Sequence, residues 1–121
     1  MHELTIARNI VSIIKEELQE RDQLDYRVSE IYFNAGRLNA VVPESLQYNF
    51  DQIKQDKEFI KDASLIIKQI PVTIKCHDCE YETTIDEPVF RCQNCDSRNI
   101  EVTAGKKMYI DSIEIEAREG K

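Results

Sequence analysis

All four cysteines of this 121-residue chain occur in two Cys-x-x-Cys pairs. Cys76 and Cys79 form the first pair, and Cys92 and Cys95 form the second after a gap of twelve residues. Each pair can point two thiolates at one centre from a tight turn, so two pairs predict a tetrahedral four-thiolate site, whose usual metal is Zn2+. Because four protein ligands leave no coordination position for a substrate, we expect this metal to be structural.

Three alternatives compete with a zinc site at the cysteines. They are two disulfides, four unrelated thiols, and iron in the same all-sulfur geometry. The paired spacing favours a metal over the first two. His77 lies inside the first pair. Since four thiolates already complete the tetrahedron, we interpret His77 as an exposed turn residue rather than a ligand.

The start of the sequence, Met1-His2-Glu3, is a second group of possible metal ligands. The bulky His2 should prevent removal of Met1. The Met1 amine, the His2 amide nitrogen and the His2 imidazole can then chelate one metal, and the Glu3 amide nitrogen or carboxylate can complete a plane. Planar nitrogen donors suit Ni2+ or Cu2+. Taken alone, such a start also arises by chance, and the alternative is a frayed, solvated terminus.

Two amphipathic helices are predicted to support these groups. Apolar residues three and four positions apart indicate a helix from about residue 4 to about residue 21. Pro43 fits the first turn of a second helix, because its missing N–H costs nothing there, and Leu46, Phe50 and Ile53 form its buried stripe.

The remaining elements are predicted to be strands. We expect one over residues 26–35 that a glycine turn at Gly36 ends, and a long one over residues 64–75 that Pro71 interrupts. Shorter segments follow at 100–103 and 108–116. The fold class is therefore α+β, with two helices packed on a three-stranded sheet and an inserted four-cysteine zinc-ribbon module. The α+β domain takes residues 1–75 and 106–121, and the zinc-binding insertion takes residues 76–105.

Composition and charge exclude several classes of function. The net charge of −7 argues against nucleic-acid binding, which needs a basic face. No apolar run approaches the ~20 residues of a membrane span, and the start lacks the pattern of a secretory signal. Cysteines confined to Cys-x-x-Cys pairs suit a reducing cytosol, so we expect a cytoplasmic protein. With two histidines, no Gly-rich phosphate loop and no nucleophile–base pair, we do not expect an enzyme.

Several motifs, taken in order, resemble one known family. They are the Met-His-Glu-Leu start before an amphipathic helix, Val-Pro-Glu-Ser-Leu at 42–46, Leu-Ile-Ile-Lys-Gln-Ile-Pro at 65–71, the two cysteine pairs, and Ile-Asp-Ser-Ile-Glu-Ile-Glu at 110–116. In this order they resemble the hydrogenase nickel-incorporation proteins of the HypA family. The likeness covers nearly the whole chain.

The resemblance implies a nickel metallochaperone for the maturation of [NiFe]-hydrogenase, and in some organisms of urease. It implies nickel binding at Met1, His2 and Glu3, with Ni2+ as transient cargo, and zinc binding at the four cysteines. The implied partners are a HypB-type GTPase, the hydrogenase large subunit as nickel acceptor and, for urease, its maturation proteins. The alternative function is a non-catalytic zinc-ribbon adaptor between proteins, without nickel chemistry.

Overall fold

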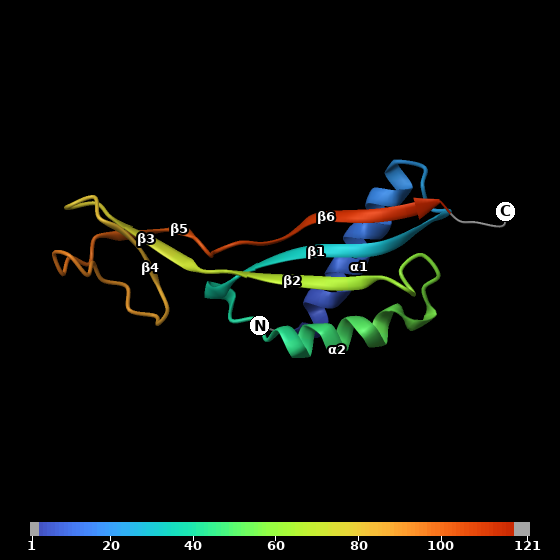
Figure 1. Ribbon diagram of the computed structural model, residues 1–121, viewed down its shortest axis with the longest axis horizontal. Helices are drawn as coiled ribbons and strands as arrows, with labels where there is room; N and C mark the ends of the chain where they lie inside the picture. The colour runs from blue at the N-terminus through green and yellow to red at the C-terminus, as the bar shows by residue number, and fades with distance from the viewer. Residues whose placement is uncertain (1–2, 118–121) are drawn as a thin grey trace. The chain divides into compact units, whose positions relative to one another are not determined.

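The computed structural model describes residues 3–117 (Figure 1). Along the chain the elements are α1 (Glu3–Glu20), β1 (Tyr26–Gly36), η1 (Arg37–Asn39), α2 (Pro43–Ile53), η2 (Lys54–Asp56), β2 (Ser64–Ile70), β3 (Val72–Cys76), β4 (Glu82–Ile85), β5 (Ile100–Ala104) and β6 (Met108–Ala117). They form two compact units. The second unit holds Asn34–Ala40 and Lys68–Tyr109, and the first holds the rest of the described chain. Neither described helix has the length and apolar character needed to cross a membrane.

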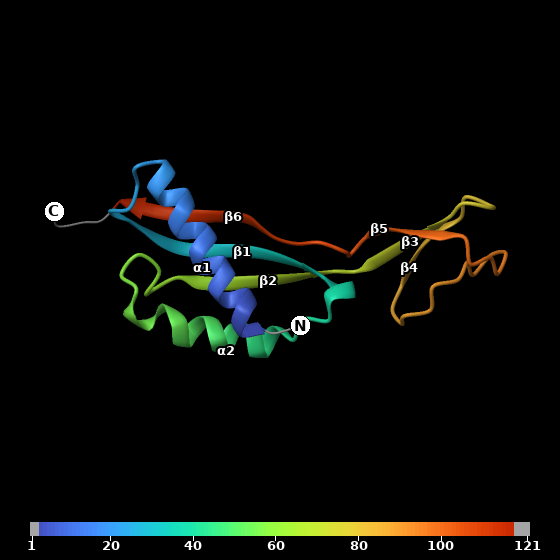
Figure 2. The same ribbon diagram turned by 180° about the vertical axis from the view of Figure 1, so that it is seen from behind.

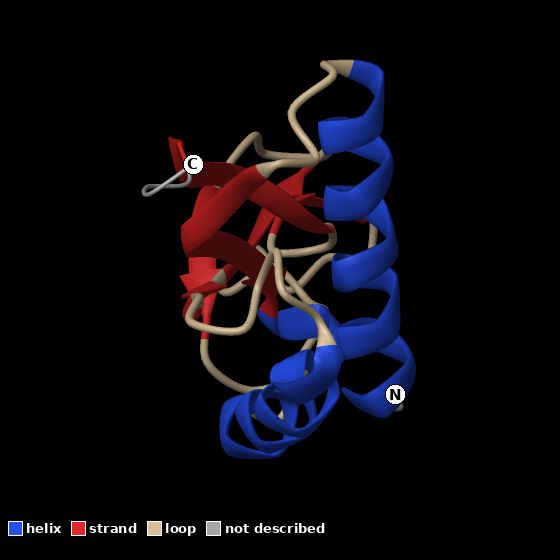
Figure 3. Cartoon of the chain, turned by 90° about the vertical axis from the view of Figure 1, so that its right-hand side faces the viewer, coloured by secondary structure: helices blue, strands red, loops and turns tan. Residues whose placement is uncertain are grey.

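The first unit is a three-stranded sheet of order β2-β1-β6 with both helices against one face. Figures 2 and 3 show α1 and α2 on the same side of these strands. The predicted α+β class, with two helices packed on a three-stranded sheet, is confirmed.

Burial explains why the two helices form where the sequence predicts them. The apolar stripe of α1 is buried as expected, at Ile6, Ala7, Ile10, Val11, Ile14 and Leu18. Helix α2 begins at Pro43, with no side-chain cap from Val42, and buries Leu46 and Phe50. These side chains share the core with Val28, Ile31 and Phe33 of β1, all at most 4% exposed.

The long strand predicted over residues 64–75 is interrupted at Pro71 as expected, but its two halves belong to different sheets. Pro71 separates two strands that belong to different sheets, β2 in the first unit's sheet and β3 in a second sheet of order β4-β3-β5. Because proline lacks a backbone N–H, it cannot donate to a ladder and marks the change of sheet. Strand β4, which the sequence did not predict, pairs antiparallel with β3.

The second sheet has a small apolar core of its own. Val72, Ile74 and Ile85 are buried, and Ile100 and Val102 pack against them. Strand β3 lies between its two neighbours, with Val72 opposite Ile85 on one side and Ile74 opposite Val102 on the other. Five apolar side chains make too small a core to stabilise a unit of this size without further support.

Gly36 is needed for close packing rather than for a turn. It has φ −64° and ψ 134°, which is extended backbone, and it is the last residue of β1. The predicted end of the strand at Gly36 is confirmed, but the turn that follows is η1, and the residue with left-handed backbone in it is Ala40, with φ 54°. A Cβ atom on Gly36 would lie 2.3 Å from the carbonyl oxygen of Gly105, so only glycine fits without movement of the backbone.

We expect Gly36→Ala to destabilise the protein by about 1–3 kcal/mol or more, because the added methyl meets backbone that cannot rotate away. The matched control is Ser112→Ala, at an exposed strand position of β6. Urea unfolding of the zinc-loaded proteins measures both. Equal urea midpoints for Gly36→Ala and the parent would show that the backbone segments around Gly36 and Gly105 can move apart without loss of stability.

Candidate metal centre

The first cysteine pair, residues 76–79, lies in a hydrogen-bonded turn that we call the first knuckle. The Cys76 N–H donates to the Tyr81 carbonyl at 2.9 Å, and the Glu80 N–H donates to the Cys76 carbonyl at 2.9 Å. Glu80 has φ 63°, in the left-handed region, which lets the chain turn back after Cys79. The Asp78 N–H donates to Cys76 Sγ at 3.3 Å.

The second knuckle, residues 92–95, repeats this arrangement position by position. The Cys92 N–H donates to the Ser97 carbonyl and the Asp96 N–H to the Cys92 carbonyl, both at 2.8 Å. Asp96 has φ 65°. Cys92 Sγ accepts hydrogen bonds from the Asn94 and Cys95 N–H groups at 3.3 and 3.4 Å. The two knuckles are thus built alike.

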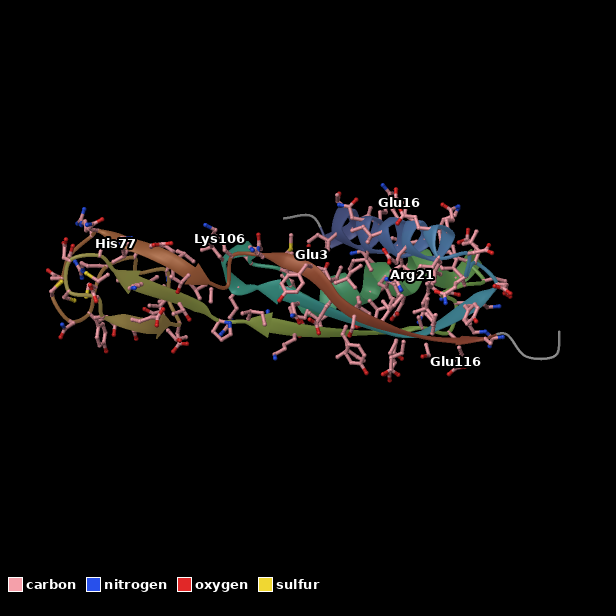
Figure 4. All side chains as sticks on the ribbon, turned by 90° about the horizontal axis from the view of Figure 1, so that it is seen from above. Glu3, Glu16, Arg21, His77, Lys106 and Glu116 are labelled. Carbon is pink, nitrogen blue, oxygen red and sulfur yellow. The ribbon has the colours of Figure 1, made fainter. Side chains whose placement is uncertain are left out.

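The two knuckles bring the four sulfur atoms into one cluster. All four Sγ atoms lie within 4.8 Å of one another, with Cys76 and Cys95 3.6 Å apart and Cys79 and Cys92 3.5 Å apart. A disulfide needs about 2.05 Å, and the four cysteines are free. Zn–S bonds of about 2.3 Å place sulfurs roughly 3.8 Å apart at the corners of a tetrahedron, so the cluster fits the predicted metal. Figure 4 shows the sulfur atoms gathered beside the labelled His77.

The pKa values of two of the four thiols differ widely. The Asn94 side chain, then the Tyr81 N–H, donate hydrogen bonds to Cys79 and lower its pKa to about 6. For Cys95, a backbone hydrogen bond from Ser97 lowers the pKa, but Cys79, burial and the other thiols outweigh it and raise the pKa to about 12. Four close thiols cannot all ionise unaided, and a divalent cation in the cluster supplies the missing charge.

His77 contacts a neighbouring strand. Its Nε2 lies 3.0 Å from Glu101 Oε1 on β5, and its N–H donates to the Asn99 carbonyl at 2.9 Å. Over the described residues, the group of side chains that could hold a metal contains the four cysteines and not His77. The interpretation of His77 as an exposed turn residue agrees with its side chain, which is 48% exposed.

The predicted nickel residues lie at the edge of the described chain. Met1 and His2 fall outside residues 3–117. Glu3 is the first residue of α1, one residue earlier than the predicted start of this helix. Its Oε2 accepts a hydrogen bond from the Val42 N–H at 2.9 Å, at the residue that precedes α2. The carboxylate of Glu3 therefore ties the start of α1 to the start of α2.

Comparison with known proteins shows which family this chain belongs to. A family profile described as "Hydrogenase/urease nickel incorporation, metallochaperone, hypA" matches residues 1–115. This chain belongs to the HypA family. The family is one of nickel metallochaperones for hydrogenase and urease maturation, so the resemblance seen in the sequence is confirmed.

Curated HypA relatives match over nearly their whole length. A hydrogenase maturation factor HypA from Desulfatibacillum aliphaticivorans is 32% identical over 115 residues, which covers 95% of this chain and 87% of that protein. The HypA of Chloroflexus aurantiacus is 35% identical over 115 residues, with 94% and 98% covered. A solution structure described as the Ni metallochaperone HypA from Helicobacter pylori shares the fold, with a TM-score of 0.69, 22% identity, and 98% and 100% of the two chains covered.

Sequence reasoning missed the polar residues around the HypA cysteine cluster. Asp78 and Asn94 occupy the third position of each Cys-x-x-Cys pair. Ser97 and Asn99 follow the second pair and bond back to the first knuckle. The one available signal was the repeat of a short polar side chain at the third position of both pairs.

Proposed function

We propose that this chain is a nickel metallochaperone that binds Ni2+ at Met1, His2 and Glu3 and delivers it during hydrogenase maturation. Family membership supports the role in maturation. The observation that carries the site is the hydrogen bond between Glu3 Oε2 and the Val42 N–H, because it fixes the third residue of the chain to the folded unit. Met1 and His2 directly precede this residue in the sequence.

The same hydrogen bond favours one of two choices for the fourth nickel donor. The Glu3 carboxylate already has a partner in the Val42 N–H. A planar site that used this carboxylate would have to break that contact, whereas the Glu3 amide nitrogen leaves it in place. We therefore assign the four donors to the Met1 amine, the His2 amide nitrogen, the His2 imidazole and the Glu3 amide nitrogen, a set that suits Ni2+.

The four cysteines would hold Zn2+ as a resident structural ion, and when bound the ion would tie the two knuckles together. Several features of this chain support that role. The N–H groups of Asp78 and Asn94 stabilise thiolates at Cys76 and Cys92, and Asn94 does so at Cys79. The small core of the second sheet also needs additional support, which a structural metal supplies.

Delivery requires that nickel leave the protein easily. Ligands on the first three residues can be released one after another when a partner offers better donors, whereas the zinc ligands are spread over two knuckles. Helix α1 begins at Glu3, the last of the proposed nickel residues, and is the proposed docking element for a HypB-type GTPase. Its exposed face presents Arg8, Lys15, Glu16 and Glu20. The nickel acceptor would be the hydrogenase large subunit, or urease maturation proteins.

Nickel affinity is expected to rise clearly between about pH 6 and pH 8. Protons compete with nickel for the Met1 amine and the His2 imidazole, whose ordinary pKa values are about 7.7–8.0 and about 6.5. Both groups are protonated at the acid end of this window, so binding is weak there and strengthens as they lose their protons. Loss of the amide protons makes the dependence steeper. Calorimetric titration of untagged, zinc-loaded protein at several pH values measures it, and a flat profile would assign nickel to other ligands.

The second candidate function is a zinc-ribbon adaptor without nickel chemistry. The exposed apolar side chains of the second unit, Tyr81, Val89 and Phe90, which are 40–44% exposed, favour it, because they could contact a partner protein. Nickel titration separates the two functions, since an adaptor binds no nickel at its first residues. Neither function requires catalysis by this chain.

A further inference from the structure

Asp78 connects the two knuckles through its carboxylate. Ser97 Oγ donates a hydrogen bond to Asp78 Oδ2, and Asn99 Nδ2 donates to Asp78 Oδ1 at 3.2 Å. Asp78 belongs to the first knuckle, whereas Ser97 and Asn99 lie in the turn that follows the second. Both carboxylate oxygens thus accept hydrogen bonds from the turn that follows the second knuckle. These hydrogen bonds are charge-assisted and therefore stronger than neutral ones.

Ser97 and Asn99, which donate hydrogen bonds to Asp78, also make hydrogen bonds with the backbone of the two knuckles. Ser97 accepts the Cys92 N–H at its carbonyl at 2.8 Å and the Asn99 N–H at its Oγ at 3.0 Å. The Asn99 carbonyl in turn accepts the His77 N–H at 2.9 Å. Asp78 is therefore two hydrogen bonds away from the backbone of Cys92, through one side chain.

Asn94 makes the reciprocal contact from the second knuckle. It occupies the same third position as Asp78, and its Nδ2 lies 3.5 Å from Cys79 Sγ in the first knuckle. The third residue of each pair thus reaches across to the other knuckle. Asn94 bonds to a sulfur directly, whereas the hydrogen bonds of the Asp78 carboxylate come from the Ser97 and Asn99 side chains in the turn after the second knuckle. Its contacts do not need a metal.

We propose that Asp78 is a positioning residue that clasps the two knuckles together independently of metal and thereby slows the release of zinc. The proposal rests on the zinc site proposed above. When one thiolate leaves the metal, the clasp keeps that thiolate close to its former position. A high local concentration of the detached ligand favours rebinding over complete dissociation. Without the clasp, fewer contacts hold the knuckles together after the first Zn–S bond breaks, so the detached thiolate moves away from the metal more often.

The test is transfer of zinc from the loaded full chain to an excess of a chromogenic chelator. Removing an outer partner of a metal site typically costs about 10–100-fold in metal affinity, so Asp78→Ala should release zinc at least about tenfold faster than the parent. Asp78→Asn keeps one acceptor oxygen and should give an intermediate rate. The matched control is Asp86→Ala, which removes the same charge from an exposed bend of the same unit and should release zinc at the parent rate.

The partner side of the clasp gives an independent variant. Ser97→Ala removes the hydroxyl that donates to Asp78, so it should also speed release, and the double variant Asp78→Ala/Ser97→Ala should be no faster than the quicker single variant. If the two residues acted independently, the increases in release rate of the two single variants would multiply in the double variant. The visible spectrum of the cobalt-loaded variants should keep the bands of a tetrahedral four-thiolate site, because the clasp changes the rate of ligand loss and not the ligand set.

The outcomes separate this inference from the proposed function. Equal release rates for Asp78→Ala and Asp86→Ala, in proteins that both hold zinc, would overturn the role of Asp78. A change in the cobalt spectrum of Asp78→Ala would also overturn it, since the residue would then determine the ligands themselves. A parent protein that holds no zinc would instead contradict the zinc site. Nickel titration of Asp78→Ala should match the parent, because the nickel residues belong to the first unit.

Discussion

Replacing Cys92 by serine should remove zinc from the protein and unfold the second sheet, while the first unit keeps its structure. Cys92 is buried, at 3% exposed, and its Sγ accepts two N–H groups of its own knuckle. A hydroxyl is a poor zinc ligand beside three thiolates. Structural zinc contributes on the order of 10–16 kcal/mol in comparable peptides, and the five-residue core of the second sheet cannot replace it.

Zinc analysis and amide NMR spectra of Cys92→Ser test this expectation together. Signals from β3, β4 and β5 should lose their dispersion, whereas those from α1 and α2 should keep theirs, because both helices belong to the first unit and the second sheet has an apolar cluster of its own. Gln93→Ser, one position away at an exposed residue of the same knuckle, should keep both zinc and the second sheet. A full complement of zinc in Cys92→Ser would contradict the four-cysteine assignment.

The helices of this fold were predictable because their signals are local. The stripe of α1 repeats at three and four residues, and Pro43 marks the start of α2 through its own covalent structure. The cysteine cluster was predictable for the same reason, because spacing alone indicates two facing turns.

Features that depend on distant parts of the chain were not predictable. Pro71 marks an interruption of residues 64–75 in the sequence, but nothing local shows that the two halves belong to different sheets. Gly36 reads as a turn residue, yet its requirement comes from Gly105, far along the sequence. The role of Asp78 depends on Ser97 and Asn99, which only the folded chain brings to it.

The proposed nickel site depends on the first residues of the chain, because one of its proposed donors is the free amine of Met1. Two residues added before Met1, such as Gly-Ser, leave His2 and Glu3 in place but move the terminal amine away from the ring that His2 closes. We expect nickel affinity to fall by roughly 100-fold or more, about 2.7 kcal/mol of binding free energy. His2→Ala, which removes the imidazole, should have a similar effect.

Neither change should disturb the folded protein. Glu3 remains the first residue of α1 and keeps its contact with the Val42 N–H, and the buried stripe of α1 begins only at Ile6. Zinc content, helix content and the urea midpoint should therefore match those of the parent. These three controls distinguish loss of a ligand from loss of structure.

The most direct test of the proposed function is calorimetric titration of nickel into untagged protein and into the same protein with Gly-Ser added before Met1, both loaded with zinc at pH 7.5. Our proposal predicts tight binding of one nickel ion per chain for the untagged protein and loss of that binding in the extended one. Equal nickel affinity in the two proteins would contradict it, because the terminal amine would then have no part in the site.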